Sequence, residues 1–453
     1  MTLLGLPPLD SAKSGNGGPH GRTLEDCVHA GDSSTPNGNH PSPQPSTSSL
    51  RGLDGFVFFV ANVQTGFGPF VSVYLTAMAW TQVDIGLMLT IGGLVALVGQ
   101  MPGGAFVDAA RSERLVAGVA VVAIGATALA FAAWPIYPVI LGAVVLHSVA
   151  SCVLGPAIAA MSLGLVAHAD IGERFGRNAR FAAIGNGLAA AAMGACGYFF
   201  SPRAVFFVTA ALLGPALLAL TFIRPTEIDP ERAHGGRAEQ PPQKPLSSLK
   251  SRALLRPLLI FSGCFMLFQL ANAAMLPLMG SVLTMRSSQW ATVLIAACIV
   301  VPQLVVALLS PWVGNRAQLW GRRPMLLLGF AALPIRGVLF AVIPDPYLLV
   351  VVQLLDGISA AVFGVMVPLV VVDVTRGTGH FNLALGIVGT AIGIGASLST
   401  TLAGYVSDHF GSGMAFLGLA AVAATGQALI WQFMPETRPN DKGTDASLQA
   451  RAR

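Results

Sequence analysis

Long apolar runs separated by short polar loops fill the chain from about residue 51 to residue 437. About 20 consecutive apolar residues suffice for one helical crossing of a bilayer, and twelve such runs can be counted. The first six lie near 54–78, 84–107, 115–134, 137–166, 181–201 and 204–223, and the last six near 256–280, 289–314, 325–343, 347–373, 382–406 and 412–433. The pattern predicts an all-α integral membrane protein with twelve transmembrane helices.

The polar segments between and around these runs predict the domain organisation. Residues 1–50 are rich in Ser, Pro, Gly and Asn and are expected to form a disordered tail. The polar stretch 224–255 is predicted to be a solvated linker, and residues 438–453 are predicted to form a second tail. Two six-helix bundles are therefore expected, over residues 51–223 and 256–437.

Composition and charge support a multi-pass protein of the cell (inner) membrane. Only 10% of the residues are charged, against about 25% in soluble domains. Basic residues accumulate on the cytoplasmic side of membrane proteins. With a cytoplasmic N-terminus, 23 of the 26 lysines and arginines fall on that side, so both termini are expected in the cytoplasm. The net charge of +5 thus follows from membrane topology, and no nucleic-acid partner is expected.

The two halves resemble each other at a common offset, which indicates an internal duplication. Three pairs agree within two residues, at offsets of 209, 208 and 207: Gly155 with Gly364, Pro69 with Pro277, and Gly197 with Gly404. The first pair places His147 opposite Asp356, and the second places Gln64 opposite Asn272. Parallel six-helix repeats are one architecture of secondary transporters, with the substrate near the midplane between the halves.

The loops after the second and eighth spans carry a degenerate pair of related motifs, "GAFVDAARSER" and "GNRAQLWGRR". With the two-half organisation, they resemble the G-x-L-A-D-R-x-G-R-R pattern of the major facilitator superfamily, although Gln318 replaces the acid of the second copy. The resemblance implies a conformational latch formed by Gly104, Asp108, Arg111, Arg114, Gly321, Arg322 and Arg323. The alternative is a pair of ordinary loops whose arginines only set the topology.

Other features depart from the drug–proton antiporters of that family. The position about twelve residues before Pro156, where those proteins have an arginine, is Val144. The fifth span has glycines, in "GNGLAAAAMGACGYFF", but lacks the G-x-x-x-G-P-x-x-G-G pattern. These differences argue against a plain multidrug antiporter.

The resemblance also places spans one, four, seven and ten around a central cavity, and these spans carry the buried polar residues. The expected neutral cavity residues are Asn62, Gln64, Gln269, Asn272 and Gln353. Buried amides need hydrogen-bond partners in a membrane. They either line a substrate site or hold helices together, and the sequence leaves both interpretations open.

Asp356 is the residue most suited to proton coupling, because it lies near the middle of an apolar span and can change its charge. His147 occupies the matching position of span four, so it could share this role, contact substrate or simply pack in the core. Arg336 lies near the middle of span nine and is the expected charge partner of Asp356. The pair is either static or opened by a proton or substrate.

These observations predict a secondary active transporter of a small organic solute and no enzyme. No phosphate-binding loop for an ATP-driven motor is present, and the scattered histidines and cysteines lack metal-ligand spacing, so no metal or cofactor is expected. Proton-coupled export is favoured. The alternatives are a proton symporter that imports a small solute or siderophore-like compound, and a non-transporting membrane scaffold or sensor. The expected partners are the solute, protons and the lipid bilayer, for a monomeric protein.

Overall fold

The computed structural model describes residues 45–65, 69–236, 252–286 and 291–438, and all regular structure in these ranges is helical. In the first half the helices are α1 (Thr47–Thr65), α2 (Pro69–Ala77), α3 (Gln82–Ala109), α4 (Glu113–Ala133), α5 (Tyr137–Leu165), η1 (His168–Asp170), α6 (Ile171–Phe199), α7 (Pro202–Ala211) and α8 (Leu213–Thr221). Two short helices follow, η2 (Pro225–Glu227) and α9 (Pro230–Ala233). The second half contains α10 (Arg252–Asn272), α11 (Met275–Arg286), α12 (Ala291–Trp320), α13 (Arg322–Val342), α14 (Pro346–Val352), α15 (Leu354–Thr375), α16 (Phe381–Phe410) and α17 (Ser412–Phe433).

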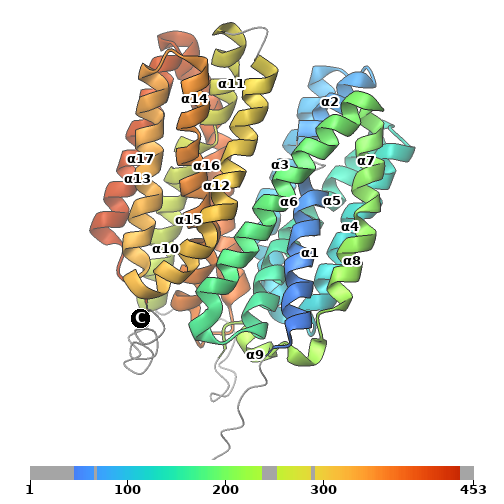
Figure 1. Cartoon of the computed structure of the whole chain (residues 1–453), viewed down its shortest axis with the longest axis vertical. Helices are drawn as coiled ribbons and strands as arrows, with labels where there is room; N and C mark the ends of the chain where they lie inside the picture. The colour runs from blue at the N-terminus through green and yellow to red at the C-terminus, as the bar shows by residue number, and fades with distance from the viewer. Residues whose placement is uncertain (1–44, 66–68, 237–251, 287–290, 439–453) are drawn as a thin grey trace, which may run out of the picture. The chain divides into compact units, whose positions relative to one another are not determined.

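The helices form the two expected groups of six spans, α1 to α8 and α10 to α17 (Figure 1). Within the first group α5 packs against α3 and α4, and α1 against α6 and α8. Within the second group α13 packs against α15 and α17, and α10 against α16 and α17. The main contacts between the groups are those of α3 with α16 and of α6 with α12.

Eleven segments of the described chain are long and apolar enough to cross a membrane, and they correspond to the predicted spans two to twelve. The predicted first span falls on α1 and α2, which are separated by residues 66–68, outside the described ranges. Three of the other spans are divided into two helices each: α7 with α8, α10 with α11, and α14 with α15. The expected all-α membrane fold is therefore confirmed, while the cytoplasmic position of the termini stays a prediction.

Helix boundaries differ from the prediction where polar residues are buried. Helix α6 begins at Ile171 instead of residue 181, because Arg174 of its second turn is buried and bonded to Asp54 of α1. Hydropathy alone assigned that polar turn to a loop. Helix α1 begins at Thr47, inside the predicted tail, and the described part of the predicted linker forms η2 and α9. The predicted disordered tails otherwise lie outside the described residues.

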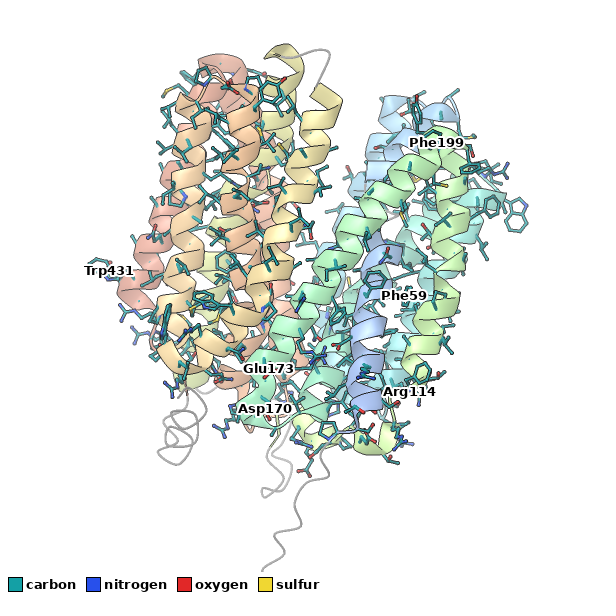
Figure 2. The ribbon with its side chains drawn as sticks, viewed as in Figure 1. Phe59, Arg114, Asp170, Glu173, Phe199 and Trp431 are labelled. Carbon is teal, nitrogen blue, oxygen red and sulfur yellow. The ribbon has the colours of Figure 1, made fainter. Side chains whose placement is uncertain are left out.

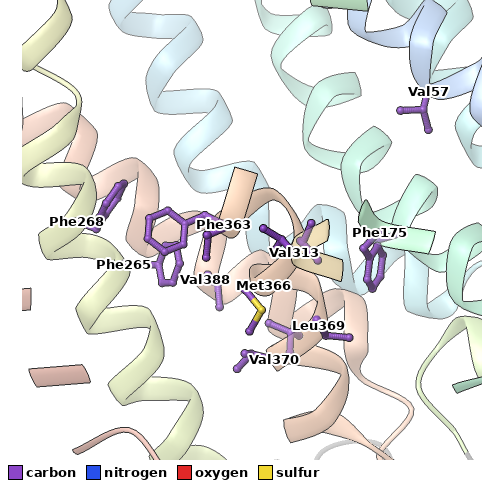
Figure 3. Packing of buried hydrophobic residues seen from close by; sticks show 14 of the residues in the cluster. Val57, Phe175, Phe265, Phe268, Val313, Phe363, Met366, Leu369, Val370 and Val388 are labelled. Carbon is purple, nitrogen blue, oxygen red and sulfur yellow. The ribbon is translucent and has the colours of Figure 1, made fainter. Parts of the chain in front are cut away.

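Side chains on the outer surfaces are apolar, as lipid contact requires. Phe199 is 75% exposed and Trp431 is 67% exposed, and both point away from the helices (Figure 2). The second half has an aromatic core in which Phe265, Phe268, Phe330 and Phe363 contact one another, with ring centroids 4.4–6.2 Å apart. Figure 3 shows Phe265, Phe268 and Phe363 in this core. Edge-to-face aromatic contacts of this kind stabilise a pair by about 0.5–1.5 kcal/mol beyond burial.

The two groups approach most closely at the end of the bundle where α3 ends and α16 begins, here called the basic end because Arg111 and Arg376 lie in its loops and Arg322 begins α13 there. A Cβ atom added to Gly104 of α3 would lie 2.1 Å from the carbonyl oxygen of Asn382 in α16. A Cβ added to Gly314 of α12 would lie 2.1 Å from the carbonyl oxygen of Gly172 in α6. At both contacts only glycine allows the backbones to meet.

Replacing Gly104 with alanine is therefore expected to push α3 away from α16 and to destabilise the arrangement that is closed at the basic end. Overpacking of this kind costs about 1–3 kcal/mol. The melting temperature of the purified protein should fall by several degrees. A matched control is Gly142→Ala in α5, where no atom lies within 4 Å of the added Cβ. Equal melting temperatures of the two variants would contradict the close contact.

Candidate functional site

An ion pair between Arg336 of α13 and Asp356 of α15 lies inside the second half. Arg336 Nη1 donates to Asp356 Oδ1, and Nη2 donates to Asn272 Oδ1 of α10. The sulfur atom of Met275 lies 3.3–3.4 Å from the same guanidinium. The Arg336 side chain is only 3% exposed, whereas that of Asp356 is 28% exposed. The pair therefore presents its carboxylate, and not its guanidinium, to the surrounding space.

Helix interruptions flank both charges. Helix α10 ends at Asn272. The N–H of Ala273 still donates to the carbonyl oxygen of Gln269, but that of Ala274 leaves the helical pattern and donates to Ser399 Oγ of α16 at 2.9 Å. At Gln353, between α14 and α15, the backbone hydrogen bonds join residues three apart instead of four. Asp356 lies in the first turn of α15, which begins after this point. Helix C-terminal ends favour cations and N-terminal ends favour anions. The C-terminal end of α10 therefore favours the guanidinium of Arg336, and the N-terminal end of α15 favours the carboxylate of Asp356.

A cavity of about 430 Å³ opens beside Asp356. Its walls come from α10, α15 and α16, and they include three aromatic rings, two amides and the carboxylate: Phe265, Phe268, Phe363, Gln269, Asn272 and Asp356. Gln269 Oε1 accepts a hydrogen bond from Asn272 Nδ2 at 3.3 Å. A chain of polar groups therefore runs from Gln269 through Asn272 and Arg336 to Asp356.

Helix α6 of the first half packs against α15 close to this cavity. Gly364 lines the cavity, and a Cβ added to it would lie 3.3 Å from the Cβ of Ala179 in α6. The described residues that line the cavity all belong to the second half.

Of the predicted site residues, Gln269, Asn272, Arg336 and Asp356 are brought together, and the others are not among the residues that line this cavity. Asn62 donates to Phe58 of its own helix at 2.8 Å and packs against Gly185 of α6. His147 lies 3.4 Å from Ser151 of its own helix. The predicted cavity residues Gln64 and Gln353 lie in α1 and between α14 and α15, and Gln353 is 1% exposed.

The predicted latch residue Asp108 joins the halves at the basic end. Its carboxylate accepts hydrogen bonds from the backbone N–H groups of Asn382 and Leu383 at 3.1 and 2.8 Å, and from Asn382 Nδ2 at 2.8 Å. Asp108 therefore caps the N-terminus of α16, where unpaired N–H groups and the helix dipole favour an anion. Backbone amides of the other half therefore bind this carboxylate.

The second copy of the motif is held by acids that the sequence analysis did not identify. Arg322 is 1% exposed and its Nε donates to Asp373 Oδ2 of α15 at 2.7 Å. The Glu436 carboxylate accepts from the backbone N–H groups of Arg322 and Arg323 at 2.8 and 3.1 Å. The acid missing at Gln318 is therefore supplied from two other segments. No hydrogen bond or ion pair joins Arg111 or Arg114 to another described residue.

A strap of residues between the halves, 225–236, adds a titratable contact at the basic end. His234 Nε2 lies 3.0 Å from Glu113 Oε1 of α4. The carbonyl oxygens of His234 and Gly235 accept hydrogen bonds from Phe381 and Gly377 of the second half, at 3.3 and 2.6 Å. The hydrogen bond to Glu113 raises the pKa of His234 above its ordinary value, while burial opposes the shift.

Comparisons with known proteins relate the chain to one family. The model of the Major Facilitator Superfamily matches it twice, over residues 55–314 and 265–452. An uncharacterised MFS-type transporter of Mycobacterium tuberculosis, found in two strains, is 42% identical over 398 residues, which cover 86% of this chain and 94% of the relative.

Solved structures show the same fold at low sequence identity. The Escherichia coli fucose:proton symporter FucP aligns with a TM-score of 0.67 and 14% identity, covering 84% of this chain and 97% of FucP. A structure of FucP in the outward conformation has a TM-score of 0.68 and 15% identity, covering 85% and 97%. The human organic anion transporter MFSD10 has a TM-score of 0.60 and 14% identity, covering 85% and 98%.

The strap predicts that stability falls at alkaline pH. Because the folded protein binds the His234 proton more tightly than the unfolded chain, the contact stabilises the fold fully below the ordinary histidine pKa of about 6.5. This contribution, about 1.5–3 kcal/mol for a hydrogen bond to a charged group, is lost as the pH rises through the raised pKa of His234 in the folded protein. The melting temperature should therefore drop more between pH 6 and pH 8.5 in the wild type than in His234→Gln.

The exposed His409 of α16 gives the matched control, since its ring contacts only its own helix and neighbouring rings there. His409→Gln should keep the pH dependence of the wild type. An unchanged pH dependence in His234→Gln would show that the strap contact does not contribute.

Proposed function

The chain belongs to the major facilitator superfamily of membrane transporters, as the paired loop motifs predicted, and we propose that it moves a small organic solute by alternating access, coupled to protons at Asp356. The observation that carries the proposal is a partly exposed carboxylate in an otherwise apolar cavity, paired to a buried arginine. An acid inside a membrane protein that faces a cavity is typical of proton pathways.

Arg336 links the charge of Asp356 to the arrangement of the helices. Removing one partner of a buried ion pair costs about 3–5 kcal/mol. Protonation of Asp356 therefore destabilises the present arrangement, because it leaves the guanidinium with uncharged partners among the described residues, namely Asn272, Met275 and the Phe340 ring. Movement of α13 relative to α10 and α15 relieves this cost. The proton thus favours a second conformation.

Movement between the halves would break the contacts at the basic end. Asp108 on α3 caps α16, and Gly172 on α6 meets Gly314 on α12, so opening at this end separates both interfaces. If the basic end is cytoplasmic, as the distribution of arginines predicts, the structure is closed to the cytoplasm. The similarity to FucP in its outward conformation supports this assignment.

We favour export in exchange for protons, because one carboxylate that accepts either a proton or a substrate gives obligatory exchange. Symport is the second candidate, and the fold similarity to FucP, a fucose:proton symporter, favours it. Both directions use the same pair of residues.

Asp356→Asn is expected to abolish solute accumulation driven by a pH gradient, because the amide cannot release a proton. Exchange of an uncharged solute of the panel across the membrane without a gradient should persist, because such a solute does not bind through the charge of the carboxylate. The measurement is flux in proteoliposomes, with a panel of organic solutes and with and without a protonophore. Asp408→Asn is the control, since this exposed aspartate of α16 contacts no described residue through an ion pair or hydrogen bond.

Arg336→Gln separates coupling from folding. If Asp356→Asn and Arg336→Gln both fail to fold, as judged by size-exclusion profile and melting temperature, the pair is structural. Gradient-driven accumulation that survives in well-folded Asp356→Asn would place the coupling elsewhere.

A further inference from the structure

We propose that the cavity beside Asp356 binds monovalent organic cations with an apolar body, and that the cation and the proton compete for the same carboxylate. This inference rests on the proposed function and adds the chemical class of its substrate.

The first observation is which charge faces the cavity. Asp356 Oδ1 is bonded to Arg336, and no described residue donates a hydrogen bond to Oδ2. The carboxylate is 28% exposed, whereas the Arg336 side chain is 3% exposed and is enclosed by Asn272, Met275 and Phe340. The accessible atoms of this ion pair are therefore negative.

The second observation is the rest of the wall. No lysine or arginine is among the lining residues, so Asp356 is the only charged side chain among the described residues that line the cavity. A bound cation would lie closer to Asp356 than to Arg336 behind it. Because Coulomb energy falls with distance, attraction to the carboxylate exceeds repulsion from the guanidinium. An anion in the same place would be repelled by its nearest charge.

The third observation concerns the body of the ligand. Phe265, Phe268 and Phe363 contribute to the walls, and aromatic rings bind both apolar groups and organic cations. The Gln269 and Asn272 amides add neutral hydrogen-bonding groups beside the carboxylate. A volume of about 430 Å³ is within the range of pockets for small organic ligands.

Competition for one carboxylate sets the stoichiometry of exchange. When a cation binds to protonated Asp356, the O–H bond breaks and the proton leaves to solvent, so one cation replaces one proton. On the other side of the membrane a proton from solvent protonates the carboxylate again and the cation leaves. The exchange balances in charge without a further ion.

Three compounds that share a benzyl group and differ in charge test the proposal: benzyltrimethylammonium, its uncharged isostere neopentylbenzene, and benzylsulfonate. Binding to the purified full chain in detergent is measured by titration calorimetry at several pH values. The wild type should bind the ammonium compound at least tenfold more tightly than the other two. Its affinity should fall as the pH is lowered, and each cation bound at acidic pH should release one proton.

Two substitutions check the role of the carboxylate. Asp356→Asn should remove the preference for the ammonium compound and the pH dependence, whereas Asp356→Glu should keep both in part. Asp408→Asn, which removes a carboxylate on the exposed surface of α16, should bind like the wild type.

Absence of ammonium binding in the wild type, or equal binding of the sulfonate or the neutral isostere, would overturn the cation assignment. An ammonium preference that persists in Asp356→Asn would overturn it as well. These results leave proton coupling intact if gradient-driven transport of another solute still requires Asp356. Loss of that requirement would instead contradict the proposed function.

Discussion

The ion pair of Arg336 and Asp356 is the interaction on which the rest of the account depends, because two charges at this depth are stable only while they stay paired. Arg336 is buried, and among the described residues its guanidinium nitrogens otherwise contact only Asn272 and Met275. In a medium of low dielectric constant, loss of one charge leaves the other uncompensated. In the proposed mechanism a single proton therefore shifts the equilibrium between two arrangements of α10, α13 and α15.

In the proposed mechanism the contacts between the halves turn this local change into access from one side. At the basic end the Asp108 carboxylate accepts the backbone N–H groups at the N-terminus of α16. The backbone of α3 contacts that of α16 at Gly104, and the backbone of α6 contacts that of α12 at Gly172. These contacts depend on exact fit and on a few hydrogen bonds, so they are either made or broken. The strap at His234 adds a charged contact at the same end. The Arg336–Asp356 ion pair and the contacts at the basic end are therefore made in the same conformation, and both stabilise it.

Much of this arrangement could be predicted from the sequence, because hydrophobic runs and isolated charges are strong signals in a membrane protein. The spans and the pairing of Arg336 with Asp356 followed from them. Asn62 and Gln353 were grouped with the cavity because periodicity gives the depth of a residue but not the direction of its side chain. Asp373 and Glu436 were missed as partners of the second loop, since they lie far along the chain and only the packing of the helices brings them to Arg322.

The central claim is that the charge of Asp356 determines which end of the protein is open. The most direct test is a distance distribution between spin labels at Gly86→Cys of α3 and Gly404→Cys of α16, two positions with open space around them, in a background without other reactive cysteines. We expect the distance to change as the pH is lowered in the wild type, and Asp356→Asn to show the acidic distribution at every pH. An identical pH response in the wild type and in Asp356→Asn would contradict the account.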